Sequence, residues 1–225
     1  MRASLLILPL MLLACSRPLS PGEEAFMADF AGDSFEPARA RIVADVPLGV
    51  ATFKYEKRPR LSCRERIHPE PDEAVITTSP AGLVLWNTLY TSEGWYLDDY
   101  LPAYPETVNL QAALFFAHEL THIWQWQNRD LTGYSPRRAA REHQVQDDPY
   151  QFELDTSTQF LGYGYEQQAS IVEEYLCCAA LDPKAPRTSR LRDLLSQNFP
   201  IDQLPRPENV ILPWEDAEIK GICRA

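Results

Sequence analysis

Two stretches of the sequence have the hydrophobic spacing of long helices. Residues 109–127 contain no Gly or Pro, and their apolar or small side chains recur every three or four positions. The residues in this repeat are Leu110, Leu114, Ala117 and Thr121. Because that period places side chains on one face of a helix, it predicts a helix over 109–127. A second helix is expected over 165–181, between Gly164 and Pro183, since glycine and proline commonly bound helices.

The rest of the pattern predicts shorter elements. Apolar and β-branched runs separated by turn residues indicate two strand pairs and one further strand. The expected pairs are 41–46 with 50–55 and 74–78 with 83–86, and the further strand is 150–156. Short helices are expected at 23–30 and 189–198, with a polar, mobile connection between the two long helices and a proline-rich tail after Asp182. Together these elements predict an α+β domain with a small β-sheet.

Composition and charge narrow the class of protein. The 225 residues are 45% hydrophobic and 24% charged, which is typical of one globular domain. These values exclude a disordered chain, a collagen-like repeat and a multi-pass membrane protein. With 21 basic and 32 acidic side chains, the formal net charge is −11. A negative field repels phosphate backbones, so we expect no nucleic-acid partner.

The N-terminus has the features of an export signal. Arg2 precedes an apolar run over residues 5–13, which is too short to span a bilayer comfortably and has the length of a signal-peptide core. The following Leu12-Leu13-Ala14-Cys15 resembles the bacterial lipobox. That resemblance implies cleavage before Cys15 and acylation of this cysteine, which anchors a protein to a membrane without a transmembrane helix.

The lipobox resemblance also divides the chain and implies a location. Residues 1–14 are expected to be a lipoprotein signal peptide, 15–22 a tether and 23–225 the folded domain. Lipidated Cys15 would hold the protein on the periplasmic side of the bacterial cell envelope, and the uncharged Ser16 favours the outer membrane. An ordinary signal peptide followed by a nearby cysteine is the alternative.

Export to an oxidising compartment would allow the remaining cysteines to form disulfides. Apart from Cys15 the chain has Cys63, Cys177, Cys178 and Cys223, an even number that indicates disulfides in an oxidising compartment. A bridge between the adjacent Cys177 and Cys178 is disfavoured because it strains disulfide geometry. We therefore expect Cys63 and Cys223 each to bond one member of that adjacent pair.

One five-residue motif carries candidate chemistry. His118-Glu119-Leu120-Thr121-His122 places two imidazoles at positions i and i+4 of the first predicted helix, so both can bind one zinc ion. Glu119 is displaced around the helix and can act as general base toward a zinc-bound water, whose pKa zinc lowers toward 7. An amphipathic helix with these polar residues on its solvent face is the alternative.

Zinc requires a third protein ligand, and several residues are candidates. The metzincin extension needs Gly at 125 and His at 128, where this chain has Gln125 and Asn128, so that subclass is excluded. His143 lies in the polar connection between the two long helices. The second helix offers Glu166, Glu173 and Glu174.

Four short elements in the same order resemble a known family. They are Leu19-Ser20-Pro21-Gly22-Glu23, Ala40-Arg41-Ile42, the run His118-Glu119-Leu120-Thr121-His122-Ile123-Trp124-Gln125, and Glu166-Gln167-Gln168-Ala169-Ser170-Ile171. They resemble small bacterial zincin-like proteins with HELTHVWQ-type and EQQA-type signatures, some of them labelled Vgr-related. The resemblance spans about residues 19–176, and only the last two elements are specific.

This resemblance implies a zincin-like fold with a gluzincin-type metal site. It favours Glu166 as the third ligand beside His118 and His122, with Glu174 as the next candidate or as an acceptor that orients a histidine. The thermolysin-like pattern places Asp four residues after the ligand Glu, where this chain has Ser170, so the usual supporting carboxylate is in doubt.

The function that follows is a lipid-anchored, zinc-dependent metallohydrolase, and specifically a peptidase with a polypeptide substrate. Glu119 is the expected general base, and the candidates for stabilising the oxyanion are Tyr163, Tyr165 and His143. One alternative is a non-catalytic zincin-fold lipoprotein that binds an envelope protein partner. Another is an envelope lipoprotein with an interaction role that involves no metal.

Overall fold

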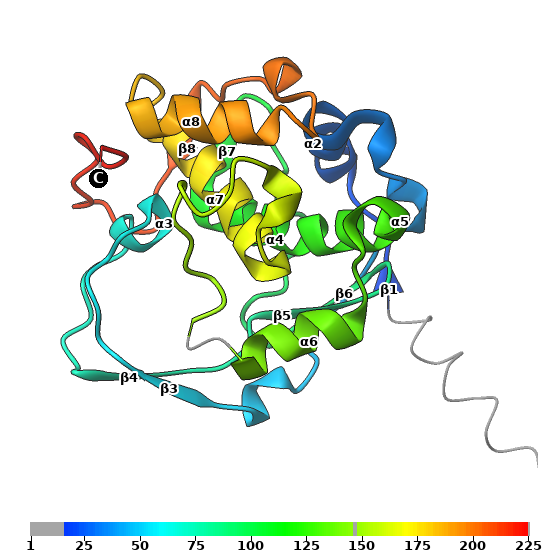
Figure 1. The fold of residues 1–225 in the computed structure, drawn as a ribbon, viewed down its shortest axis with the longest axis horizontal. Helices are drawn as coiled ribbons and strands as arrows, with labels where there is room; N and C mark the ends of the chain where they lie inside the picture. The colour runs from blue at the N-terminus through cyan, green and yellow to red at the C-terminus, as the bar shows by residue number, and fades with distance from the viewer. Residues whose placement is uncertain (1–15, 146–147, 225) are drawn as a thin grey trace, which may run out of the picture.

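The computed structural model of the protein describes residues 16–145 and 148–224 (Figure 1). The predicted signal peptide and the lipobox Cys15 lie outside the described residues. Within 16–145 and 148–224, none of the helices combines the length and the apolar character needed to cross a membrane.

The described residues form a mixed α and β structure with small sheets, as the sequence predicts at this coarse level. Seven α-helices are present in the described chain: α2 (Pro21–Ala31), α3 (Cys63–Arg66), α4 (Leu110–Gln127), α5 (Arg129–Thr132), α6 (Pro136–Val145), α7 (Tyr165–Leu181) and α8 (Pro186–Leu195). The strands are β1 (Ser16–Arg17), β2 (Arg41–Val43), β3 (Phe53–Glu56), β4 (Val75–Thr78), β5 (Gly82–Leu85), β6 (Thr88–Thr91), β7 (Thr107–Asn109) and β8 (Asn209–Ile211).

Helix α4 is the centre of the molecule and packs along α7 (Figure 1). Its first turn is capped by Asn109, whose side chain accepts a hydrogen bond from the N–H of Ala112. Fifteen of its 18 residues are buried, so α4 has no wide solvent face. The motif residues His118, Glu119 and His122 are therefore inside the protein, which contradicts the alternative of a solvent-facing polar stripe.

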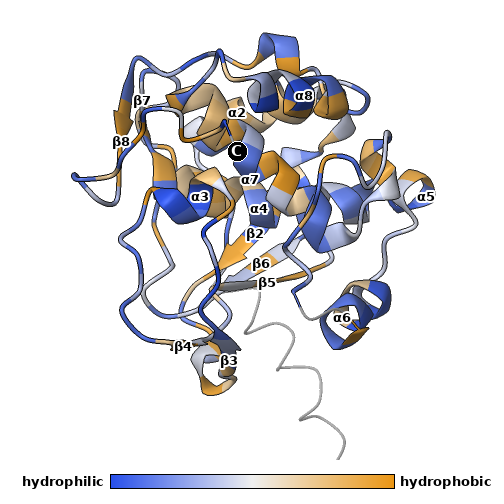
Figure 2. Cartoon of the chain, turned by 60° about the vertical axis from the view of Figure 1, so that its left-hand side comes forward, coloured by the Kyte–Doolittle hydropathy of each residue, from blue (hydrophilic) through white to orange (hydrophobic). Residues whose placement is uncertain are grey.

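The hydrophobic core surrounds α4. On one side lies α2, which begins with a capping box between Ser20 and Glu23. Aromatic side chains from distant segments meet there, including Phe30 and Trp124, whose rings both lie 4.6 Å from that of Phe199. In Figure 2, β2 is strongly hydrophobic, whereas the loops at the periphery are largely hydrophilic. This packing fixes α4 and α7 against each other.

The sheets are connected differently from the predicted strand pairs. The four-stranded sheet has the order β1-β2-β6-β5, in which β2 is parallel to β6 and the other neighbours are antiparallel. Strand β3 pairs with β4 in a separate two-stranded antiparallel sheet, which Figure 1 shows away from α2 and α8. The prediction that 41–46 pairs with 50–55 and 74–78 with 83–86 is wrong, because β6 supplies partners for both β2 and β5.

Two other segments also differ from the prediction. No strand forms over 150–156, where the described backbone has turns and bends. Much of the connection expected to be polar and mobile is helix α6, which packs against α7. Within the expected tether, Ser16 and Arg17 form strand β1, which pairs with β2.

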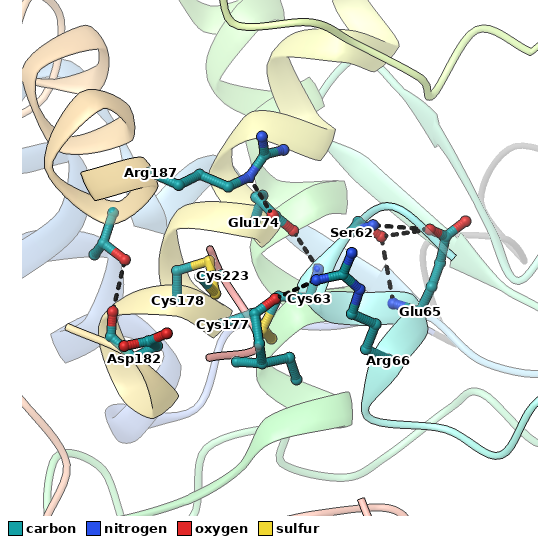
Figure 3. Close-up of a disulfide and its surroundings, with 12 residues drawn as sticks. Ser62, Cys63, Glu65, Arg66, Glu174, Cys177, Cys178, Asp182, Arg187 and Cys223 are labelled. Carbon is teal, nitrogen blue, oxygen red and sulfur yellow. Dashed lines mark hydrogen bonds and ion pairs between the residues drawn. A yellow bond between two sulfur atoms is a disulfide. The ribbon is translucent and has the colours of Figure 1, made fainter. Parts of the chain in front are cut away.

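Two disulfides join α7 to distant parts of the chain, and they confirm the predicted pairing rule. Cys63 of α3 bonds Cys177, and Cys223 of the C-terminal tail bonds Cys178 (Figure 3). The residue separations are 114 and 45. On a chain-entropy view, loops of these lengths make the two bonds worth a similar amount, about 4–5 kcal/mol each.

Candidate metal centre

Three side chains from two helices converge on one point. Helix α4 contributes His118 and His122, one turn apart, and α7 contributes Glu166. The Nε2 atoms of the two histidines lie 3.3 Å apart, and Oε2 of Glu166 lies 3.3 Å from each of them. All three residues are buried, with 6–7% of their surface exposed. This group could hold a metal ion, and it consists of the three residues that the sequence predicts as ligands.

The surroundings fix which imidazole nitrogens carry protons. Nδ1 of His118 lies 3.0 Å from a carboxylate oxygen of Glu173, which can only accept, so this nitrogen donates. Nδ1 of His122 lies 2.9 Å from Oε1 of Gln125, whose amide nitrogen donates to two oxygen atoms of α7. When both imidazoles are neutral, their Nε2 lone pairs therefore face Glu166. Three acceptor atoms then meet without a donor between them, which is the arrangement that a cation satisfies; in the protein chain alone, a proton on His118 supplies the donor.

Glu173 is the carboxylate that orients a histidine, whereas the sequence favours Glu174 for that role. Seven residues are nearly two helical turns, so Glu173 returns to the face of α7 that carries Glu166. Glu174 points away from the centre and accepts hydrogen bonds from the N–H of Cys63 and from Arg187 (Figure 3).

Ser170 occupies the position where the thermolysin-like pattern has aspartate. It is 5% exposed, and its hydroxyl has no hydrogen-bond partner within the described part of the chain. Glu173 compensates for this departure, because it supplies the supporting carboxylate from the next turn of α7.

The second oxygen of Glu166 is also bound. Oε1 lies 3.0 Å from Nε2 of His143 on α6, so His143 donates to Glu166 instead of joining the group of three. The neighbouring Glu142 accepts hydrogen bonds from the backbone N–H groups of Tyr165 and Glu166. Because these N–H groups begin α7 and have no helical acceptor, Glu142 caps that helix from outside. Helix α6 thus holds Glu166 at both its backbone and its carboxylate.

Glu119 lies beside the three residues and contacts a strand. Its carboxylate faces Gly82 at the start of β5, where an added Cβ would stand 2.6 Å from Oε1. Only glycine allows so close an approach. Strand β5 forms one edge of the four-stranded sheet, so Glu119 lies between the His-His-Glu group and a sheet edge.

The closely spaced carboxylates and imidazoles shift the pKa values of several residues in the site. Burial alone would lower the pKa of His118, but the charge and hydrogen bonds of Glu173 and Glu166 raise it to about 10. Burial likewise opposes the ionised form of Glu166, and the histidines outweigh it and hold its pKa well below the usual range. Burial raises the pKa of Glu119, and the charge of the two histidines opposes that rise. Glu119 therefore holds a proton more readily than Glu166 does.

Two of the three residues considered for oxyanion stabilisation are engaged elsewhere. The hydroxyl of Tyr163 bonds the loop around Ser157, and that of Tyr165 donates to the carbonyl of Gly133. The exposed His143 remains beside the centre. Tyr150, which the sequence does not single out, has its ring 5.9 Å from that of His118 and 5.7 Å from that of His143.

A small cavity adjoins the centre on the side of Glu173. Its volume is about 130 Å³, and its lining includes Ser170, Glu173 and Tyr150. A larger groove of about 1080 Å³ lies near β3, β4 and the C-terminal tail, and none of the residues of the metal centre line it. Of these two hollows, the small cavity is therefore the one next to the candidate metal centre.

Sequence reasoning misses the residues that support the centre from elsewhere. Glu173 is named from the sequence only as a candidate ligand, and its spacing of seven from Glu166 on a predicted helix is the signal for its supporting role. No sequence pattern identifies the supporting roles of Gly82, Glu142 and Arg64, the last of which donates a hydrogen bond to Glu173. Each of these residues acts across segments that only the fold brings together.

Comparisons with known proteins give little further information. No protein-family model and no curated protein matches the chain. Among solved structures, the effector domain of Pseudomonas aeruginosa VgrG2b is similar over 81% of this chain and 83% of that chain, with 22% identity and a TM-score of 0.47.

Proposed function

We propose that this protein is a zinc-dependent hydrolase with a zincin-like site, and that its substrates are polypeptides. The observation that carries the proposal is the group formed by His118, His122 and Glu166, with Glu119 beside it. The donor set, two imidazole nitrogens and one carboxylate oxygen, is typical of catalytic zinc sites that keep one position open.

The spacing of the three donor atoms supports zinc. Zinc bonds to nitrogen and oxygen are about 2.0–2.1 Å long, and the edge of a tetrahedron with such bonds is about 3.3–3.4 Å. The three donor atoms are 3.3 Å apart in each pair, so they form one face of such a tetrahedron. His118 and His122 would bind through Nε2 and Glu166 through Oε2. Zinc in this position would act as a Lewis acid toward a carbonyl or a water.

The roles of the protein groups follow from their positions. Glu119 is next to the group without being one of the three, so its carboxylate can accept a proton from an attacking water and later return it to a leaving amine. The raised pKa of Glu119 lies closer to neutral pH, where the carboxylate would have to accept the proton and later release it. Tyr150 lies beside His118 and His143 beside Glu166, so their polar groups would stabilise charge that develops on a carbonyl oxygen.

A polypeptide substrate is supported by the sheet edge next to Glu119. Extended peptides commonly bind proteins by adding a strand to an exposed sheet edge. Strand β5 is such an edge, and its first residue, Gly82, contacts the Glu119 carboxylate. A peptide paired with β5 would pass close to the general base.

The cellular location is also part of the proposal. The lipobox implies a lipid anchor at Cys15 on the periplasmic side of the envelope. Two disulfides among the described residues support an oxidising compartment, because such bonds seldom persist in a reducing cytoplasm.

The decisive experiment measures zinc content and peptide cleavage on the same preparations. Protein purified without chelators is analysed for zinc per chain and incubated with quenched fluorescent peptide libraries and an unfolded protein. We expect about one zinc per chain. Glu119→Gln should keep the zinc and lose cleavage, whereas His118→Ala should lose both. Glu24→Gln, an exposed glutamate on α2, is the matched control and should change neither.

Each other outcome has a definite meaning. Zinc bound without cleavage of any polypeptide would favour the alternative, a non-catalytic lipoprotein that recognises an envelope partner. Absence of zinc after the metal has been supplied and the excess removed would contradict the metal site and with it the hydrolase.

A further inference from the structure

We propose that the disulfide between Cys63 and Cys177 controls the affinity of the His-His-Glu group for zinc, and that Arg64 is the positioning residue through which it acts. The proposal concerns regulation of the site described above, and it rests on the zinc binding proposed there. Its consequence is that the centre acquires full affinity only after the chain has been oxidised.

A short series of contacts connects the disulfide to the metal centre. Cys63 is bonded to Cys177 of α7, and the next residue in the chain is Arg64. Nη1 of Arg64 lies 2.5 Å from Oε2 of Glu173. That same oxygen accepts the hydrogen bond from Nδ1 of His118. The disulfide is therefore separated from a proposed zinc ligand by one arginine and one glutamate.

Arg64 matters because Glu173 is buried. The Glu173 side chain is 5% exposed, whereas Arg64 is 33% exposed and brings its charge in from the surface. A buried carboxylate is costly unless it is paired with a cation and hydrogen-bonded. Without Arg64, Glu173 would lose the partner that holds its Oε2 toward Nδ1 of His118, and the imidazole would no longer be fixed with Nε2 facing the other two donor atoms.

Arg64 depends on the disulfide because this bond is the covalent tie at the residue directly before it. Helix α3 has four residues, too few for a stable helix on its own, and Cys63 is the one that is buried. The preceding and following strands, β3 and β4, contain no buried residue. The other ties of this segment are noncovalent. They include the fully buried Ile67 directly after α3 and the hydrogen bond from the N–H of Cys63 to Glu174 (Figure 3).

The second disulfide provides a control within the same helix. Cys178 is adjacent to Cys177, and its bond to Cys223 is equally buried and tethers the C-terminal tail. Neither Cys178 nor Cys223 adjoins a residue that contacts Glu173. Opening this bond removes a comparable cross-link from the chain and leaves Arg64 attached to α7.

The redox step is the ordinary formation of a disulfide. The thiols of Cys63 and Cys177 together lose two protons and two electrons and form one S–S bond. The oxidant is a disulfide of a partner molecule, which accepts both and becomes two thiols. Thiol reductants reverse the step.

The experiment compares zinc dissociation constants by competition with a chromogenic chelator. It uses the wild-type protein, the pair Cys63→Ser/Cys177→Ser and the pair Cys178→Ser/Cys223→Ser. Serine variants are preferable to a reductant because reduction would free thiols that bind zinc themselves. Three of the sulfur atoms, those of Cys63, Cys178 and Cys223, lie within 4.8 Å of one another. Circular dichroism confirms that each variant is folded.

We expect the first pair to weaken zinc binding by about 10–100-fold, the usual effect of losing a group that orients a ligand. The second pair should leave the dissociation constant unchanged, although both pairs lower the melting temperature. Arg64→Gln, with both disulfides intact, should reproduce the loss. Combining Arg64→Gln with Cys63→Ser/Cys177→Ser should cause no additional loss, because both changes act through one contact.

Several results would overturn the proposal. If a folded Cys63→Ser/Cys177→Ser protein binds zinc as tightly as the wild type, the disulfide does not control the site. If Arg64→Gln binds zinc normally, Arg64 does not carry the effect, and this variant decides the question even if the serine pair fails to fold. Failure of the oxidised wild type to bind zinc would instead contradict the proposed function itself.

Discussion

The carboxylate of Glu119 packs against Gly82 so closely that a side chain on Gly82 would displace it. An added Cβ would stand 2.6 Å from Oε1 and 2.8 Å from the carboxyl carbon. We therefore predict that Gly82→Ala moves Glu119 and leaves the three proposed ligands in place. Misplacing a catalytic group by about 1 Å can cost about 100-fold in rate, so we expect kcat for peptide cleavage to fall by about that factor.

The measurement is kcat together with zinc per chain on the same sample. Gly49→Ala is a suitable control, since nothing lies within 4 Å of a Cβ at that position. Loss of zinc in Gly82→Ala would contradict the prediction, because it would show that the strand supports the ligands and not the base alone.

Glu142 should stabilise the protein through the first turn of α7. Its carboxylate accepts from the N–H groups of Tyr165 and Glu166, which have no helical acceptor. Glu142→Ala should therefore lower the free energy of unfolding by about 1–2 kcal/mol, the usual cost of losing a helix cap. Thermal or denaturant unfolding measures this directly. Arg141→Ala, the exposed neighbour on α6, should change it by less than about 0.5 kcal/mol, and equal effects of the two variants would disprove the capping role.

The sequence predicts the helix that carries the His118–His122 motif and its partner helix almost to the residue. Expected spans of 109–127 and 165–181 compare with α4 at Leu110–Gln127 and α7 at Tyr165–Leu181. These helices are long, carry a strong local period and have clear boundary residues, so neighbouring positions along the chain determine them. The candidate ligands follow, because spacing along a helix fixes which side chains share a face.

The strand pairing could not be predicted in the same way. Strands β2 and β5 both pair with β6, which has the sequence Thr-Leu-Tyr-Thr and only four residues. Parallel pairing of β2 with β6 joins segments separated by the whole β3–β4 sheet, and no local pattern records that contact. The ionic partner of Glu173 is likewise invisible in the sequence, since Arg64 reaches it only after the disulfide and the fold bring α3 to α7.

Replacing Ser170 with alanine should stabilise the protein. Its hydroxyl is buried and has no partner among residues 16–145 and 148–224, so it was desolvated without compensation. Alanine also favours a helix interior over serine by roughly 0.5 kcal/mol. We expect Ser170→Ala to raise the free energy of unfolding by about 0.5–2 kcal/mol.

The contrasting variant is Ser34→Ala, which removes a hydroxyl that donates to the carbonyl of Ala31 and accepts from the indole of Trp124. It should destabilise the protein by about 1–3 kcal/mol, because the buried indole N–H loses its acceptor. Chemical denaturation gives both values. A destabilised Ser170→Ala protein would indicate that the hydroxyl has a bound partner, such as an ordered water in the adjoining cavity.

Glu166 and Glu174 lie eight residues apart on α7 and should have separable roles. Oε2 of Glu166 completes the His-His-Glu group, whereas Glu174 binds the N–H of Cys63 and the guanidinium of Arg187. Glu166→Ala should reduce zinc per chain nearly to zero. Glu174→Ala should keep the zinc at saturating concentrations and lose about 2–4 kcal/mol of stability, because an N–H and an arginine lose their buried partner. Zinc analysis combined with denaturant unfolding distinguishes the two effects. If Glu174→Ala lost its zinc while Glu166→Ala retained it, the assignment of the third ligand would be reversed.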